Sequence, residues 1–309
     1  MSNRSASGIT FAFGAAAISG LAVFVNGYGV RAVHDATVYT TAKNLVAALV
    51  LGILALALAG RSAGSGRGTP AALPRTARQF AGLAAIAVIG GSVPFVLFFE
   101  GLARASSTHA AFVQKTLVVW VAVLAVPLLG ERLRALHVAA MALIVGGLVL
   151  LDGGLRGFRF GDGELLILAA TLLWAVEVVV AKRLLRDLAP GTVALARMGA
   201  GVLVLLGWLA ITGRFDALVG LSGRGWAWSL ATGFILAGYV ATWFVALSRA
   251  AAIDVTAVLA AGAVLTALLG LVVQGTRLPN AAGLALLLAG AGLVALHRFS
   301  ARNTAVVAQ

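Results

Sequence analysis

The sequence predicts an all-α integral membrane protein in which ten transmembrane helices form two inverted five-helix repeats around a central cavity. Three observations predict this fold. Of the 309 residues, 61% are hydrophobic and only 11% are charged, which is more apolar surface than a soluble core of that length can bury. Apolar runs long enough to cross a bilayer recur along the chain. The sequence also repeats itself, since GERL at 130–133 returns as GTRL at 275–278, a shift of 145 residues from 130 to 275.

A spanning helix needs about 20 mostly apolar residues, so the spans are bounded by the polar or Gly/Pro-rich breaks between apolar runs. The ten resulting segments are 8–30, 36–59, 79–102, 107–129, 134–151, 162–183, 191–212, 226–248, 253–273 and 280–298. They form two units, 8–151 and 162–298, that match under the repeat. Because five is odd, the second unit enters the membrane from the opposite side. The first segment aligns with the sixth, so we expect a helix of the fold and not a cleavable signal peptide.

Lysine and arginine predict the orientation, because cytoplasmic loops carry an excess of both. With the N-terminus inside, the inner segments hold thirteen of these residues and the outer ones seven. We therefore expect both termini in the cytoplasm and a multi-pass protein of the cell (inner or plasma) membrane. Scattered loop charges also account for the net charge of +13, so the partners we expect are a lipid bilayer and a small molecule, not nucleic acid.

Several local features occur in a fixed order along this repeated pattern. An LGERL turn at 129–133 precedes a glycine-containing apolar helix, Trp174 lies in the sixth segment, and Pro190 and Arg197 flank the start of the seventh. In this order, the chain resembles the EamA-type branch of the drug/metabolite transporter superfamily from about residue 9 to 297. The resemblance implies a secondary carrier that exports small metabolites, often amino acids or related compounds, from a central cavity by alternating access.

The chain departs from that family pattern at two points. The proline expected midway along the fourth helix is missing from the stretch Lys115–Trp120, so the usual shape of that helix is in question. In the second copy of the turn, Thr276 stands where the first has Glu131, so the two turns are not equivalent. We expect Glu131 to have a structural or gating role.

Five charged residues fall inside predicted spans, where a charge costs about 2.5–3.5 kcal/mol on insertion scales and usually faces protein or water. Lys43 and Arg197 are equivalent under a shift of 154 residues, from 43 to 197. Both lie near the entrance of their helices, where long basic side chains can extend to the interface. A position kept in both halves favours a structural role, so we expect Lys43 and Arg197 to anchor the scaffold.

Glu100 and Lys115 lie on either side of the short turn between the third and fourth helices. Counted from that turn, their depths differ by about three residues, or roughly 4–5 Å, so they could meet. The second half has Val245 and Ala260 at the matching positions. Two interpretations remain open: a cavity-lining pair that a zwitterion such as an amino acid could replace, or a structural ion pair that fixes the hairpin.

Glu177 stands alone in the sixth segment, where the first half has Val23. A single intramembrane carboxylate is either protonated or turned toward a watery cavity, and either state suits proton coupling. A hydrogen bond between packed helices is the alternative.

Polar and aromatic residues at mid-helix complete the predicted cavity, where they could stack on a substrate or orient it. The alternative is that most simply pack against neighbouring helices or lipid. The candidates are Asn26, Tyr28, Gln114, Trp120, Trp174, Tyr239 and Trp243.

Proline and glycine predict where helices bend and where they approach closely. Pro94 lies in the middle of the third helix and removes a backbone donor, which invites a kink. Tyr239 replaces it in the second half, so we expect uneven gating. Small residues allow close packing in lipid, and glycines recur in the fifth and tenth segments at Gly146 and Gly147 and at Gly290 and Gly292.

Other classes of function lack a matching pattern. We find no G-x-x-x-x-G-K-[ST] loop, so we expect uniport, exchange or proton coupling, without a cofactor. No catalytic motif or metal-ligand cluster is evident, and the chain has no cysteine. A membrane-embedded enzyme or a non-transporting scaffold is a weaker alternative.

The nearest rival is a carrier of nucleotide sugars or phosphorylated metabolites, which needs more cations at the cavity. Ten helices can enclose a cavity alone, so we expect a monomer.

Overall fold

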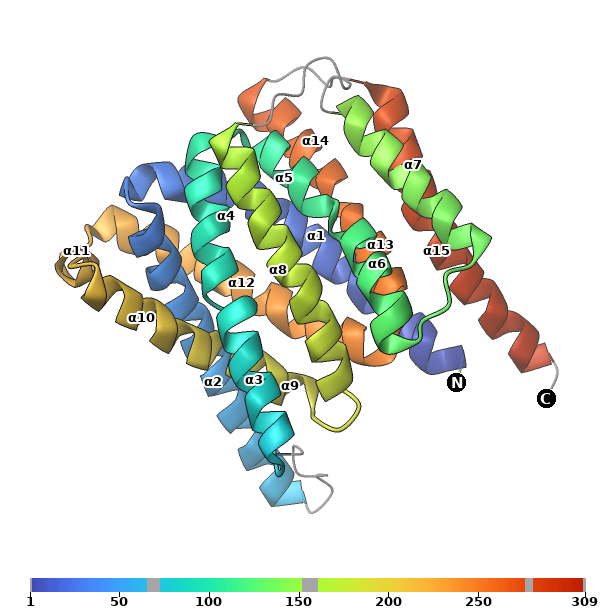
Figure 1. The fold of residues 1–309 in the computed structure, drawn as a ribbon, viewed down its shortest axis with the longest axis horizontal. Helices are drawn as coiled ribbons and strands as arrows, with labels where there is room; N and C mark the ends of the chain where they lie inside the picture. Colours follow the sequence, from blue (N-terminus) through green and yellow to red (C-terminus); the bar gives the residue numbers. More distant parts are fainter. Residues whose placement is uncertain (1, 66–72, 152–160, 276–279, 308–309) are drawn as a thin grey trace.

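The structure is a computed structural model that describes residues 2–65, 73–151, 161–275 and 280–307 (Figure 1). Every regular element in these ranges is helical. Residues 276–278 of the second turn, including Thr276, lie outside the described residues. Both chain ends lie at the same end of the helical bundle in Figure 1.

In the described part of the first predicted unit and the residues just before it, there are seven helical elements. They are α1 (Ser2–Val33), α2 (Ala36–Ser65), α3 (Ala77–Ile89), α4 (Val93–Arg104), α5 (Ser107–Lys115), α6 (Leu117–Leu129) and α7 (Ala135–Leu151). The second unit contains α8 (Asp162–Leu184), α9 (Pro190–Leu195), the π-helix η1 (Ala196–Ala200), α10 (Gly201–Ile211), α11 (Phe215–Val219), α12 (Gly223–Arg249), α13 (Ala252–Ala260), α14 (Gly262–Gln274) and α15 (Ala281–Val307). Each predicted segment corresponds to one helix or to consecutive helices that continue one another.

Eight helical stretches in the described residues are long and apolar enough to cross a membrane. Two further apolar helices, Ala135–Leu151 and Ala281–His297, are shorter. The helices of the bundle carry many exposed large hydrophobic side chains, such as Leu56 on α2 and Val272 on α14, which suits contact with lipid. The prediction of a helical membrane protein is thus confirmed, whereas ten spans in an inverted repeat stay a prediction.

Helix contacts are paired between the two halves. α1 packs against α12, and its repeat equivalent α8 packs against α4, which is the equivalent of part of α12. α7 packs along α15 (Figure 1), where a Cβ on Gly147 would meet Gly283 O at 2.7 Å and one on Gly290 would meet Ala140 O at 2.7 Å. These glycines allow the close packing that the sequence predicted. Gly146 and Gly292 were wrongly included, since a Cβ on Gly146 would meet only Leu286 Cδ1, at 4.0 Å, and Gly292 has open space around it.

The fourth predicted segment, 107–129, breaks at Thr116 between α5 and α6. The ninth, 253–273, breaks at Ala261 between α13 and α14, which is 145 residues later. The break therefore forms without the missing proline and recurs in both halves. The repeated turns also agree, since Gly130 and Gly275 both end their helices in the left-handed conformation, with φ of 68° and 65°. Glycine adopts that conformation without strain.

The third predicted segment, 79–102, is interrupted between α3 and α4. Gly90, Gly91 and Ser92 separate the two helices, and Pro94 lies in the first turn of α4. This is the predicted kink. The equivalent Tyr239 lies within the continuous helix α12. Backbone groups freed inside a membrane need other partners. Here Trp174 Nε1 donates to Gly90 O at 3.2 Å, while Asn44 Nδ2 donates to Gly91 O at 3.3 Å.

Candidate functional site

A cavity lies at the centre of the bundle, bounded by helices of both halves. The space between its lining atoms, together with open solvent at its mouth, amounts to about 730 Å³. The predicted cavity residues that line it are Asn26, Gln114, Trp174, Glu177, Tyr239 and Trp243. Lys43 and Arg197, predicted as scaffold anchors, line it as well. Glu100, Lys115, Tyr28 and Trp120 are not among the lining residues.

Glu177 is not alone, as the sequence predicted, because it forms a buried ion pair with Arg197. Arg197 Nε lies 2.8 Å from Glu177 Oε1, and Nη2 donates to Oε2 at 3.2 Å. The two side chains are only 4% and 2% exposed. Arg197 belongs to η1, and π-helical turns within helices are frequent at functional sites. Arg197 therefore carries a charge at the cavity and does not extend to an interface.

Lys43 projects from α2 into the same cavity and is 1% exposed. Its Nζ lies 4.0 Å from the centre of the Phe99 ring and 5.0 Å from that of Phe95. Arg197 also lies over Phe95, at 5.2 Å. Ring faces attract cations. The prediction that Lys43 extends toward an interface was wrong, because its ammonium is held inside the bundle between aromatic rings.

Aromatic side chains form the cavity walls. Trp174 contacts Phe95 and Phe98 with ring centres 5.5 Å apart in each case. On α12, Tyr239 and Trp243 stack at 6.1 Å. Such rings offer flat apolar faces with well-defined orientation. The tryptophans and the tyrosine were predicted from the sequence, but the phenylalanines were not, although their spacing of three to four residues on α4 was an available signal.

The predicted pair between Glu100 and Lys115 does not form. Glu100 Oε2 lies 3.0 Å from Arg104 Nη2, and its Oε1 accepts from Thr37 Oγ1 at 3.0 Å. Both Glu100 and Arg104 are partly exposed near the end of α4. The depths along the helices were compatible, but the two side chains point to different neighbours.

Lys115 instead connects α5 to α1. Its Nζ donates to Ser19 Oγ at 2.8 Å and to Gln114 Oε1 at 3.0 Å, and the residue is 2% exposed. Ser19 and Gln114 both line the cavity. Lys115 therefore orients two polar groups of the lining from behind it. Ser19 was missed because a single serine in an apolar helix carries no distinctive pattern.

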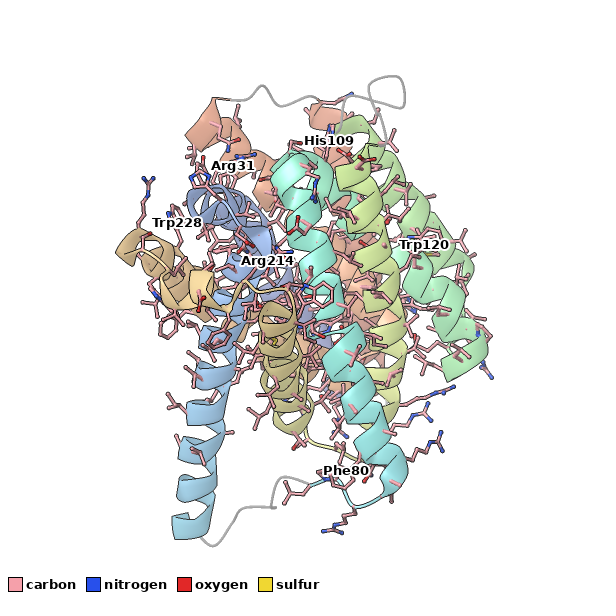
Figure 2. All side chains as sticks on the ribbon, turned by 60° about the vertical axis from the view of Figure 1, so that its left-hand side comes forward. Arg31, Phe80, His109, Trp120, Arg214 and Trp228 are labelled. Carbon is pink, nitrogen blue, oxygen red and sulfur yellow. The ribbon has the colours of Figure 1, made fainter. Side chains whose placement is uncertain are left out.

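Two other predicted residues lie elsewhere. Tyr28 stacks on Trp228 at 6.2 Å and its hydroxyl accepts from Gln274 Nε2 at 3.1 Å. Trp120 donates to Thr116 Oγ1 at 3.3 Å and is half-buried. Figure 2 shows Trp120 and Trp228 toward the outside of the bundle, on different sides. The alternative interpretation, packing against helices or lipid, holds for both Tyr28 and Trp120.

Glu131 binds the start of a helix in the other half. Its Oε1 accepts from Ala252 N at 2.7 Å and its Oε2 accepts from Ile253 N at 3.1 Å. These N–H groups begin α13 and have no partner within that helix. Next to it, His137 Nε2 lies 3.1 Å from Asp254 Oδ1, both buried. Glu131 therefore joins the turn of the first half to α13 of the second half.

Asn26 has a structural partner as well as a place in the lining. Tyr39 donates its hydroxyl to Asn26 Oδ1 at 2.7 Å, and the hydroxyl lies 2.9 Å from Thr232 Oγ1. This contact joins α1, α2 and α12 beside the cavity. Across the described residues, no group of three His, Cys, Asp or Glu side chains is placed to hold a metal ion.

Comparison with known proteins now defines the class. The model of the EamA-like transporter family matches residues 6–151 and 162–297, so the chain belongs to this family. Membership makes the chain a membrane transporter of the drug/metabolite transporter superfamily. No curated protein matches the chain. One solved structure, described as "Crystal structure of protein", is similar at a TM-score of 0.71 and 23% identity, covering 94% of this chain and 97% of its own. That likeness supports the fold.

Proposed function

We propose that this protein is a secondary transporter that moves small organic metabolites out of the cell through the central cavity by alternating access. One observation carries the proposal: three buried charged side chains, Lys43, Glu177 and Arg197, face a cavity between the two halves. Charges at membrane depth are costly and usually mark a substrate or ion pathway. Membership in the EamA-like family supplies the class of protein.

The proposed architecture is that of two inverted five-helix repeats, 8–151 and 162–298, with both termini in the cytoplasm of a cell whose inner or plasma membrane holds the protein. The paired contacts of α1 with α12 and of α8 with α4 support the repeat. The excess of Lys and Arg supports the orientation. One chain provides both halves of the cavity, so we propose that it works as a monomer.

Amino acids or related carboxylates are the substrates that we propose first. Glu100 and Lys115, the pair expected to bind a zwitterion, have other partners and do not form a pair. Lys43 and Arg197 are the basic residues of the cavity, and Glu177, its acidic residue, is bound to Arg197. Transport is downhill, by exchange, or coupled to protons.

A carrier of nucleotide sugars or phosphorylated metabolites is the rival function. It needs several basic residues at the cavity, and two of them, Lys43 and Arg197, line it. However, Glu177 neutralises Arg197, so the described lining holds two cations and one carboxylate, a net charge of +1. That charge matches a substrate with one negative charge better than a dianionic phosphate. We therefore favour the carboxylate.

Filling the cavity tests the transport function without knowledge of the substrate charge. Ala22 lines the cavity, whereas Ala17 on the same helix is exposed on the outside. In proteoliposomes given a panel of labelled amino acids and carboxylates, we expect Ala22→Trp to reduce the initial rate at least tenfold and Ala17→Trp to leave it within twofold. Ala22→Leu should give an intermediate rate.

Each variant is first checked for a monodisperse gel-filtration peak and an unchanged unfolding temperature. Equal transport by wild type and Ala22→Trp, with both proteins folded, would place the pathway elsewhere and refute the central cavity.

A further inference from the structure

Among the residues whose side chains the structure describes, the buried Lys43 Nζ has no acidic partner. The side chain is 1% exposed and lines the cavity. Its contacts are the ring faces of Phe99 and Phe95, at 4.0 and 5.0 Å. Across the residues whose side chains are described, no hydrogen bond or ion pair engages its Nζ. A buried charge is normally paired, so the geometry leaves a place for a negative group supplied by a ligand.

The carboxylate of the cavity is already engaged. Both oxygens of Glu177 face Arg197, at 2.8 Å from Nε and 3.2 Å from Nη2. Glu177 is thus bound to an arginine, and a ligand ammonium would have to share this carboxylate with the Arg197 guanidinium. Among the described lining residues there is no second carboxylate.

Apolar surface dominates the rest of the lining. The lining shared with Lys43 includes four large aromatic side chains, Trp174, Trp243, Phe95 and Phe98. A ligand that fills the cavity must remove apolar surface from water, which favours an uncharged hydrocarbon or aryl body. An ammonium group on that body would lose its hydration and would be repelled by a lining of net positive charge.

We propose that the cavity binds monovalent organic anions, with the ligand carboxylate on Lys43 and the apolar body against the aromatic walls, and that it does not recognise an amino group. The proposal rests on the proposed transport function and narrows its substrate class. It ranks a deaminated carboxylic acid above the amino acid of the same carbon skeleton, and it ranks the corresponding amine last.

Matched ligands test this ranking on the wild-type full-length protein. The first set is 3-phenylpropionate, phenylalanine and 2-phenylethylamine; the second is hexanoate, norleucine and pentylamine. Dissociation constants come from titration calorimetry in detergent, with protein-free micelles subtracted. In at least one set, we expect the acid to bind tenfold or more tightly than the amino acid, and the amine not to bind. An amino acid that binds as tightly as its acid, or acids of neither set binding, overturns the proposal.

A substitution then locates the anion. Lys43→Met keeps an unbranched side chain, one atom shorter, and removes the amino group, so we expect binding of the acid to weaken at least tenfold. Arg104→Met removes a cation outside the cavity, half-exposed at the end of α4, and serves as the control that keeps the wild-type ranking. Acid binding that survives Lys43→Met in a folded protein overturns the assignment. If Lys43→Met does not fold, the wild-type ranking decides alone.

The two proposals fail in different ways. Transport of any substrate that Ala22→Trp blocks supports the proposed function, whatever the ligand ranking. Amino acids that bind best and are transported would leave the transporter function intact and overturn only the preference for simple anions.

Discussion

Replacing Glu177 by glutamine leaves the Arg197 guanidinium buried without a counter-charge. Both side chains are at most 4% exposed, and their charged groups approach to 2.8 Å. Removing one partner of a buried ion pair typically costs about 3–5 kcal/mol, because the remaining charge stays desolvated. Arg197 keeps the ring faces of Phe95 and Phe244, at 5.2 and 6.0 Å. We therefore expect Glu177→Gln to lower the free energy of unfolding by about 3 kcal/mol, the lower end of that range.

The double variant separates the ion pair from packing. Replacing a buried pair with apolar groups of similar volume is often neutral or stabilising. Glu177→Leu combined with Arg197→Met should therefore recover most of the stability that Glu177→Gln loses. The free energy of unfolding is measured by titration with SDS in mixed micelles, followed by tryptophan fluorescence. A loss under about 1 kcal/mol for Glu177→Gln, the level of a solvated surface pair, would refute the argument that Arg197 depends on Glu177.

Three further predictions concern residues outside the ion pair. Glu131→Ala removes the acceptor of two N–H groups of α13 and should lower stability by about 1 kcal/mol, with Glu131→Gln losing less, in the same SDS titration. Glu100→Gln should leave the initial transport rate within twofold, since Glu100 pairs with Arg104 away from the cavity; a large loss would restore it as a substrate residue. Gly91→Ala would place a Cβ against the Arg197 carbonyl oxygen and should cost about 1–3 kcal/mol or more, whereas Gly207→Ala, with open space around it, should be close to neutral in the same titration.

Helix positions were predictable because hydrocarbon thickness sets a minimum apolar length. The predicted segment 107–129 coincides with α5 and α6, Ser107–Leu129, and 162–183 differs by one residue from Asp162–Leu184. Interruptions inside helices were less predictable. Pro94 signalled the break in helix three, but nothing local signals the break at Thr116 or the π-helix around Arg197, since both depend on contacts with other helices.

The site residues show what counting along a helix can and cannot decide. Depth counting paired Glu100 with Lys115, but depth leaves the direction around the helix undetermined, and successive side chains turn by about 100°. The same counting would have found the real pair. Glu177 precedes the end of α8 at Leu184 by seven residues, and Arg197 follows the start of α9 at Pro190 by seven. Their equal depth was available in the sequence.

Lys43 and Arg197 were assigned to the scaffold because a position kept in both halves favours shared architecture. Both side chains instead reach the cavity, one from α2 and one from η1. In an inverted repeat, equivalent positions near the pseudo-twofold axis meet at the centre, so repetition and a site at the cavity are compatible. Symmetry alone could not distinguish an anchor from a site residue.

The asymmetry of charge between the halves leads to a last prediction. The shift that relates Lys43 to Arg197 also relates Val23 to Glu177, and Val23 lines the cavity. The first half therefore has the cation without its carboxylate. Val23→Glu should supply one, bind Lys43 and reduce the net charge of the lining from +1 to zero.

We expect Val23→Glu to abolish binding of organic acids and to leave the protein folded, because each cation then has its own counter-charge. Val23→Gln adds a side chain of similar size without charge and should weaken acid binding less, which separates charge from occupied volume. Calorimetry with 3-phenylpropionate and hexanoate measures both variants beside wild type. Equal weakening by Glu and Gln would mean that volume alone blocks the site, and unchanged binding in Val23→Glu would show that the ligand carboxylate does not rest on Lys43.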